Sequence, residues 1–425
     1  MKKRILFFGF FIFLSISTTT AWATEESVDQ GLSLDQALQT AFVRNPKMIE
    51  ARKEISASKG RWIQAEALPD PEVGVDIGGL KKQRKDEKEV RDGNLDSVTI
   101  KQPLDPLGTR FLRARIGHDG VNIAKGELDI IWGEVRKAVI ENYARILAEE
   151  KAQEIVQDNL NTTRQFFSKV ETRFQSGSAL KSDLIRAKIE VSRAENDLLV
   201  SQKNLKVSKG ELNLALGQGV EDPLVLKDTL AYEALQYEYE KIRRQAVGAR
   251  ADVRNEATRL SSKQKGLWSA VLTTFFPKMA IGLQRTTQDF ENDTAILIEA
   301  SYPLWGFNLG QIKEAKAEKE KQKVHLDALK REVGLEVYRA FLEAELADKQ
   351  VVLQKQTLEE SNELLRQITI RYEAGEIQFL TYLENIKTIK ETRLAYFNVL
   401  KDYKERVAEL ERVIQATPVP ERVTK

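Results

Sequence analysis

The segment RFQSGSALKSDL, residues 173–184, lies between two long, charged stretches with helical character. A related segment, RYEAGEIQFLTYL, begins 198 residues later at Arg371. In each segment an arginine followed by an aromatic residue precedes a glycine, Gly177 or Gly375. Glycine readily adopts the left-handed conformation that ends many helices, so both segments are predicted to be tight turns between antiparallel helices. Two such turns at this spacing indicate an internal duplication.

Further landmarks recur in the same order along the chain. Lys59-Gly60-Arg61-Trp62 is matched by Lys265-Gly266-Leu267-Trp268, and Gln102-Pro103-Leu104 is matched by Tyr302-Pro303-Leu304. We therefore expect two structural repeats, at 24–216 and 233–413, joined by a linker at 217–232 and followed by a tail at 414–425. Glycine and proline in the linker are expected to end the preceding helix.

Each repeat is predicted to contain two short strands followed by a long helical hairpin. The predicted strands are about 72–79, 96–103, 278–285 and 294–303, and the hairpins are about 107–216 and 307–413. Apolar and polar residues alternate along the strands; for example, Met279 and Ile281 flank Ala280. This alternation is typical of a sheet with one apolar and one polar face. A half-buried soluble sheet and a lipid-facing barrel with a wet lumen both show it.

The number of strands favours the membrane interpretation and an oligomer. Four strands are too few to close a barrel that spans lipid, and unpaired amides are prohibitive in hydrocarbon. Three copies would supply 12 strands, so we expect a homotrimer with cyclic symmetry. The predicted fold class is mainly α, with a small membrane β-barrel shared between copies and long helical hairpins that continue it as an α-barrel.

The helix lengths predict a rod. At 1.5 Å per residue, stretches 107–174 and 307–374 would each be about 100 Å long. The first helix is expected to begin at Ser33 and to break at Asn45-Pro46. We expect the shorter arm 178–216 to stack end to end on 234–271, and the arm 376–413 to stack on 33–67. The joints would then form a belt partway along the rod.

The N-terminus carries the features of a secretory signal. Three basic residues, an apolar run from Ile5 to Ile16 and an A-x-A site at Ala21-Trp22-Ala23 predict a signal peptide at 1–23. Of the 66 Lys and Arg residues, three lie in this signal, and 64 Asp and Glu oppose the rest. The mature chain is therefore nearly neutral and lacks electrostatic support for nucleic-acid binding. The chain has no cysteine, which excludes a lipid-anchor cysteine and disulfides.

The sequence offers no pattern for catalysis or for a cofactor. The two histidines, His118 and His325, are 207 residues apart and stand in no HExxH motif. No GxSxG motif and no phosphate-binding loop occurs. Glu and Asp pairs are expected on helices of this composition, so they do not indicate acid–base catalysis. We predict that the protein is not an enzyme and binds no cofactor or metal of its own.

The layout resembles the TolC family of outer-membrane efflux proteins. The resemblance rests on the opening helix from Ser33 to Pro46, on Leu68-Pro69-Asp70-Pro71 before a strand, on Gln102-Pro103-Leu104 after one, and on the two glycine turns. It implies a trimeric channel-tunnel in the outer membrane that extends into the periplasm. It also implies two partners, a periplasmic adaptor and an inner-membrane pump, the pump being of the RND type.

The resemblance assigns roles to residues near the two turns. Arg173, Gly177, Arg371 and Gly375 match the family's periplasmic tips, where the adaptor engages. The family's constricting carboxylates correspond to Thr381 and Glu384 after the second turn and to Asp183 after the first. Thr381 departs from the pattern, so Asp183 and Glu384 remain as gate candidates. An exposed helix-face glutamate is the alternative interpretation of Glu384.

The predicted function is that of a passive outer-membrane duct for small solutes. Its length and its lack of a lipid anchor resemble the heavy-metal (CzcC/CusC-like) branch of the family, which favours metal cations as the exported solutes. Drug export and type I protein export by the same kind of duct are the alternatives. A periplasmic coiled-coil adaptor is a further alternative, although such a protein should carry one helical hairpin flanked by β-rich domains.

Overall fold

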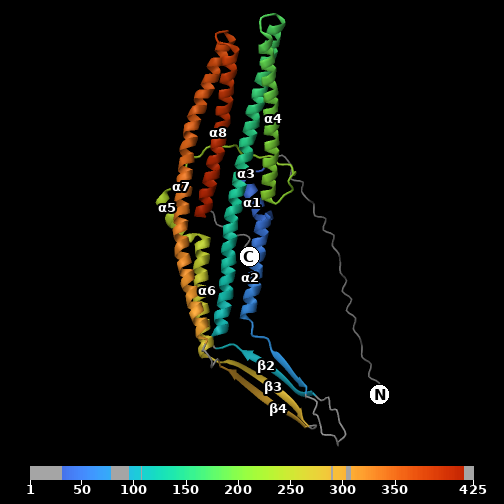
Figure 1. Ribbon diagram of the computed structural model, residues 1–425, viewed down its shortest axis with the longest axis vertical. Coiled ribbons are helices and arrows are strands. Elements are labelled where there is room, and N and C mark those ends of the chain that lie inside the picture. The colour runs from blue at the N-terminus through green and yellow to red at the C-terminus, as the bar shows by residue number, and fades with distance from the viewer. Residues whose placement is uncertain (1–30, 78–94, 107, 289–290, 303–307, 416–425) are drawn as a thin grey trace, which may run out of the picture.

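A computed structural model describes residues 31–77, 95–106, 108–288, 291–302 and 308–415. The molecule is a rod with a small sheet at one end and two helical hairpin tips at the other (Figure 1). Shorter helices meet at a waist between these ends. The predicted signal peptide and residues 416–425 of the predicted tail lie outside the described residues.

The sheet has four strands that all pair antiparallel in the order β1-β2-β3-β4. They are β1 (Glu72–Ile77), β2 (Leu95–Leu104), β3 (Lys278–Gln288) and β4 (Glu291–Ser301). The four strands form the two strand pairs that the sequence predicts. β4 begins at Glu291, earlier than the predicted 294, because its pairing with β3 continues to the pair Gln288–Glu291.

The register places the apolar residues of all four strands on one face. Val73 lies opposite Ile100, Ile100 opposite Leu283, and Leu283 opposite Ile296. All four side chains are exposed in the single chain, up to 75% for Ile296. The opposite face carries polar groups, among them the Lys101–Glu299 ion pair. One sheet face therefore lies unburied and apolar.

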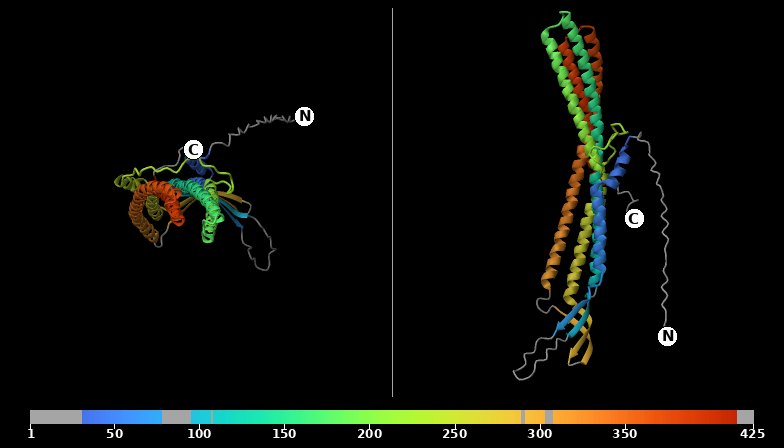
Figure 2. Two further views of the ribbon diagram at one scale, coloured as in Figure 1. Left: turned by 90° about the horizontal axis from the view of Figure 1, so that it is seen from above. Right: turned by 90° about the vertical axis from the view of Figure 1, so that its right-hand side faces the viewer.

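Two long helices connect the sheet to the tips. α3 (Thr109–Gln175) and α7 (Leu309–Glu373) each run the length of the rod, and α4 (Lys181–Leu216) and α8 (Phe379–Ile414) return from the tips to the waist. Near the tips the helices pack in the order α7, α8, α3, α4, and between waist and sheet in the order α7, α6, α3, α2. Seen from above, they form a curved row with α7 and α4 at its two edges (Figure 2).

The short helices at the waist are α1 (Leu34–Arg44), α2 (Pro46–Glu66), α5 (Tyr239–Ala249) and α6 (Ala251–Phe275). α1 begins as predicted, because Ser33 and Gln36 form a reciprocal capping box. The predicted break follows at Asn45, whose side chain caps α2. The arm predicted at 234–271 also breaks, between Ala249 and Ala251.

The predicted end-to-end stacking across the repeats is wrong. Asn45 donates its side-chain N–H to the carbonyl of Ala215 at 2.7 Å, so α4 ends against α2 of its own repeat. The Ala251 N–H likewise donates to Oε1 of Gln415 at 2.7 Å, so α8 ends against α6. The two arms stack within repeats because the linker crosses the helical row after α4 instead of continuing along the axis of α4.

The linker crosses the waist without helix as far as Glu238, beyond the predicted limit of 232. Its start is tied to the chain beside α1 by a parallel bridge between Leu32 and Leu226. Further along, the Tyr232 hydroxyl and the Leu235 N–H both donate to Oδ1 of Asp348 on α7, at 2.9 and 3.2 Å. These hydrogen bonds fix the linker across the helical row (Figure 1).

The waist holds a hydrophobic core for each repeat. In the first repeat Phe42, Met48, Trp132 and Leu212 pack together, and Phe42 meets Trp132 edge to face at 5.2 Å between ring centroids. In the second repeat, Ile242, Val333, Val337 and Leu410 form the corresponding cluster. In the first repeat α3 thus packs against both α1 and α2, and in the second repeat α7 packs against both α5 and α6.

Candidate functional site

The two tips have the same backbone geometry. Gly177 and Gly375 both have φ +76°, the left-handed conformation that the sequence predicts. The residue after each glycine closes the turn: the Ser178 N–H donates to the Arg173 carbonyl at 2.7 Å, and the Glu376 N–H donates to the Arg371 carbonyl at 2.9 Å. These are Schellman-type bonds that satisfy the last carbonyls of α3 and α7. Each tip is a well-terminated helical hairpin.

The charges at the two tips differ. Nε of Arg371 lies 3.3 Å from Oε2 of Glu376, and both side chains are 60% exposed. Ser178 occupies the equivalent position in the first tip, so Arg173 has no matching intra-tip acid. Both arginines lie on the surface at the end of the rod, where a protein partner can reach them.

The candidate gate residues lie just behind the tips. Asp183 is half-buried in the first turn of α4, and Glu384 is exposed near the start of α8. Thr381 is also exposed, on the turn of α8 before Glu384. Among the hydrogen bonds and ion pairs of the described residues, none joins Asp183 to Glu384.

Behind the turns, aromatic rings join the two hairpins. Tyr372 and Tyr382 stack at 4.4 Å with an interplanar angle of 19°, and Phe166 of α3 lies 5.8 and 6.4 Å from them. Ile368 and Ile389 belong to the same buried cluster, together with Val170 and Ala187. Ring pairs at these distances stabilise a contact beyond the area that they bury. The hairpin α7–α8 is thereby packed against α3.

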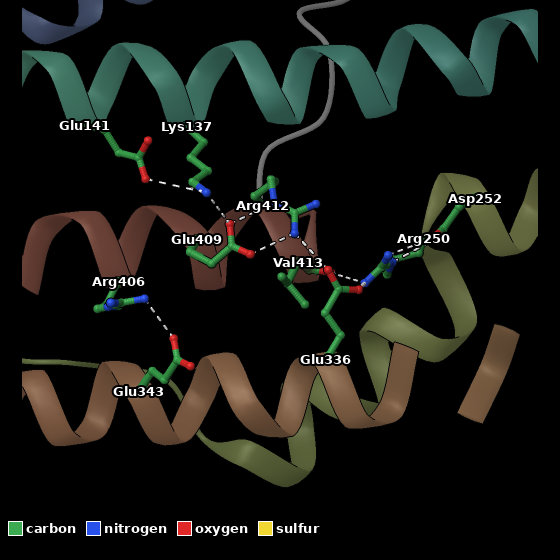
Figure 3. Close-up of polar contacts among 10 residues, drawn as sticks. All are labelled: Lys137, Glu141, Arg250, Asp252, Glu336, Glu343, Arg406, Glu409, Arg412 and Val413. Atoms are coloured by element: carbon green, nitrogen blue, oxygen red, sulfur yellow. Dashed lines mark hydrogen bonds and ion pairs between the residues drawn. The ribbon is translucent and has the colours of Figure 1, made fainter. Parts of the chain in front are cut away.

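An ionic network of the waist surrounds Arg250, at the break between α5 and α6 (Figure 3). Its side chain is 10% exposed and pairs with Asp252 and with Oε2 of Glu336 on α7, each at 2.6 Å. It also donates to the Val413 carbonyl at the end of α8, at 3.2 Å. The other oxygen of Glu336 accepts from Arg412 of α8 at 2.8 Å. Glu336 thus bridges two arginines from different elements.

The network continues onto α3 through Glu409. This carboxylate accepts from Arg412 at 2.8 Å and pairs with Lys137 of α3 at 3.0 Å. Burial opposes its ionisation, but the hydrogen bonds from Arg412 and Lys137 outweigh burial and lower the pKa of Glu409 to about 2. Nearby Glu141 behaves in the opposite way, since burial raises its pKa despite the attraction of Lys137. The waist therefore ties α3, α7, α8 and the α5–α6 break together by ionised groups.

The aromatic cluster and the ionic network were not anticipated from the sequence. The rings of Phe166, Tyr372 and Tyr382 come from three helices, and only the spacing of Tyr372 before the second glycine turn was visible. Arg250 precedes a helix that the sequence pattern did not separate from its neighbour. Glu336 is one of many glutamates on α7, so nothing in the local pattern distinguishes it.

The described part of the chain contains no group of three or more His, Asp or Glu residues that could hold a metal ion. Over the same residues, none of the helices combines the length and the apolar character needed to cross a membrane.

The family model of outer membrane efflux proteins matches residues 37–218 and 242–414. The chain belongs to the outer membrane efflux protein family. The two matched segments correspond to the two repeats that the fold displays. As a member of this family the protein is a non-enzymatic efflux channel of the outer membrane that extends into the periplasm, as the sequence resemblance predicts.

Individual relatives of this efflux channel are distant. The cobalt-zinc-cadmium resistance protein CzcC of Cupriavidus metallidurans is 21% identical over 90% of both chains. The pyoverdine export outer membrane protein OpmQ of Pseudomonas aeruginosa is 20% identical over 84% of this chain and 79% of its own. The crystal structure of VceC from Vibrio cholerae superposes with a TM-score of 0.71 at 16% identity, over 90% of this chain and 95% of that one.

Proposed function

We propose that three copies of this chain close into one duct through which heavy-metal cations leave the periplasm for the exterior. The observation that carries the assembly is the sheet, whose edge strands β1 and β4 each pair with one neighbour only among the described residues. In a membrane, unpaired strand edges are prohibitive, so β4 of one copy pairs with β1 of the next. The exposed apolar face around Ile296 then contacts lipid, and the face with Lys101 and Glu299 lines the wet interior.

The choice of cargo rests on likeness rather than on a binding site in the chain. Similarity to a cobalt-zinc-cadmium resistance protein extends over 90% of both chains, which supports divalent metal cations as substrates. Similarity to a pyoverdine export protein supports a second candidate, export of a siderophore or other small organic molecule. A duct conducts its cargo without retaining it, so neither candidate requires a metal-binding cluster.

In this proposal the tips are the contact point for other components. Arg173, Gly177, Arg371 and Gly375 form the surface that a periplasmic adaptor engages, with an RND-type pump supplying energy from the inner membrane. Support comes from the surface position of both arginines at the end of the rod and from the matching geometry of both turns. Asp183 and Glu384 are placed at the gate, where acidic side chains from three copies would attract cations.

The cargo is tested by deleting the protein in its host and measuring growth inhibition by cobalt, zinc, cadmium and a panel of organic compounds. Sensitivity to the metals alone, restored by the intact chain, is expected. Sensitivity confined to organic compounds, or to none, would contradict metal export.

The gate is tested by Glu384→Ala in planar bilayers. Removal of three carboxylates should weaken block by divalent cations. Glu343→Ala, which removes a half-buried acid paired with Arg406 at the waist, should leave block unchanged. Identical block in the Glu384 variant and the unmodified channel would remove Glu384 from the gate.

A further inference from the structure

The end of the rod next to the sheet exposes a large apolar side chain on each of three neighbouring helices. Phe111 lies in the first turn of α3, Leu309 begins α7 and Phe275 ends α6, and their exposed fractions are 60%, 61% and 64%. These helix ends join the strands β2, β4 and β3 and lie at one level along the rod (Figure 1). We call the three residues the collar. Large apolar side chains gathered in the open mark a contact surface.

The collar lies on one face of the helical row. α6 packs against both α3 and α7, and a groove of about 380 Å³ is lined by Ile116, Gly266 and Glu314 of these helices. The collar position is five residues from the lining residue on α3 and on α7, and nine residues from it on α6. A helix turns about 100° per residue, so these offsets correspond to rotations of about 140° and 180°. All three collar side chains therefore point to the face opposite the groove.

The two faces differ in chemistry. Besides Glu314, the groove is lined by Lys263 and Glu318, which pair at 2.6 Å. Charged groups suit the water-filled interior of the proposed duct, whereas apolar side chains suit its outside where lipid begins. The collar face is therefore the outer face of the rod, next to the membrane that holds the sheet.

Two cations lie one turn beyond the collar and on the same side of their helices. Arg115 and Lys313 follow Phe111 and Leu309 by four residues, which places them about 6 Å further from the sheet. The guanidinium carbon of Arg115 lies 4.7 Å from the centroid of the Phe111 ring. The headgroup layer on each side of a bilayer is about 5–8 Å thick. With the collar at the edge of the hydrocarbon, both cations lie at the depth of the lipid phosphates.

These cations have no acidic partner within the described ranges of the chain. Arg115 and Lys313 form no ion pair there, whereas the nearby Arg113 pairs with Asp105 at 2.9 Å. An offset of 198 residues relates Arg115 to Lys313, so the two repeats carry a cation at the same place. Basic side chains at the edge of a membrane attract anionic headgroups, and the apolar collar beside them suits acyl chains. A free phosphate ion has no use for the collar, so the combination fits a phospholipid.

We propose that this surface binds anionic phospholipids of the periplasmic leaflet, with Arg115 and Lys313 on the phosphates and the collar on the acyl chains. The inference rests on the lipid-facing sheet proposed above, which sets the level of the collar. Three copies repeat the two cations around the duct. The contact fixes how deeply the sheet sits in the membrane and how far the rod projects from it.

The test measures which lipid gathers near Trp268, which lies two turns before Phe275 on the same side of α6 and is 57% exposed. The full-length protein is reconstituted into phosphatidylcholine vesicles that contain a minor fraction of brominated phosphatidylglycerol. A parallel sample contains the same fraction of brominated phosphatidylcholine. Bromine quenches nearby tryptophan, and the difference from Trp268→Phe isolates the signal of this one residue.

The anionic lipid should quench Trp268 about fivefold more efficiently than the zwitterionic lipid, because a cation near the surface enriches anionic headgroups by about that factor. Arg115→Gln with Lys313→Gln should make the two lipids equal. Arg115→Lys with Lys313→Arg keeps both charges and should keep the preference. The matched control, Arg186→Gln with Lys188→Gln, removes two exposed cations of α4 near the tips and should also keep it.

Flotation with the vesicles separates the two levels of the proposal. Protein that does not float would overturn the lipid-facing sheet and, with it, the proposed duct. In protein that floats, three results would overturn only the headgroup contact: no quenching of Trp268 by either lipid, equal quenching by both, or a preference that survives Arg115→Gln with Lys313→Gln. Inorganic phosphate and sodium chloride at equal ionic strength should weaken the preference equally. A loss caused by phosphate alone would show that the cations bind the free ion and not a lipid.

Discussion

Replacing Arg250 by alanine should destabilise the protein more than the loss of any single surface ion pair. The guanidinium pairs with Asp252 and Glu336 at 2.6 Å and donates to the Val413 carbonyl, with only 10% of the side chain exposed. Breaking a buried pair by removing one partner costs about 3–5 kcal/mol, because the remaining charge stays buried. Glu336 keeps Arg412 as a partner, and the side chains of Asp252 and Glu336 are 25% and 37% exposed, so the expected loss is at most about 3 kcal/mol.

The matched control is Arg254→Ala on the same helix. Arg254 pairs with Asp129 at 2.9 Å, but its side chain is 56% exposed. Exposed pairs contribute about 0–1 kcal/mol, so this variant should unfold almost as the unmodified protein does. A third variant, Glu336→Gln, keeps the shape of the bridging side chain and removes its charge.

The assay is guanidinium-induced unfolding of the detergent-solubilised protein, followed by circular dichroism at neutral pH. A double-mutant cycle of Arg250→Ala and Glu336→Gln should give a coupling free energy of about 1–3 kcal/mol, since the two residues are in direct contact. The claim that the network stabilises the waist would be refuted if Arg250→Ala lost no more unfolding free energy than Arg254→Ala. A coupling free energy near zero would refute it as well.

Two further predictions concern the same region. Glu409→Gln should lower stability at neutral pH by up to about 3 kcal/mol, because the folded state depresses the Glu409 pKa to about 2 from an ordinary value of 4.5. That contribution is present above pH 4.5 and is lost as the pH falls towards 2, so acid titration of unfolding should show a shallower decline in the variant than in the unmodified protein. Gly217→Ala should cost at least about 1–2 kcal/mol, because φ is +73° and a Cβ would lie 2.4 Å from the Arg44 carbonyl oxygen. Gly266→Ala, where a Cβ meets nothing within 4 Å, should be neutral or stabilising in the same unfolding measurement.

The sequence alone determined the duplicated layout and the type of each main element. Period-two alternation identified the strand pairs, and the glycine turns marked the tips, because both signals are local and follow from backbone geometry. The break at Asn45-Pro46 was visible for the same reason, since proline starts a helix and disfavours helix in the residue before it.

Only the tertiary structure decided which arms stack and which side chains meet. The arms stack within repeats because Asn45 caps the end of α4 and Gln415 caps the start of α6, contacts between residues more than 160 positions apart. Arg250, Glu336 and Glu409 resemble dozens of other charges on solvated helices until folding brings them together. The pairing of distant residues depends on how the helices pack, and a local pattern contains no information about that packing.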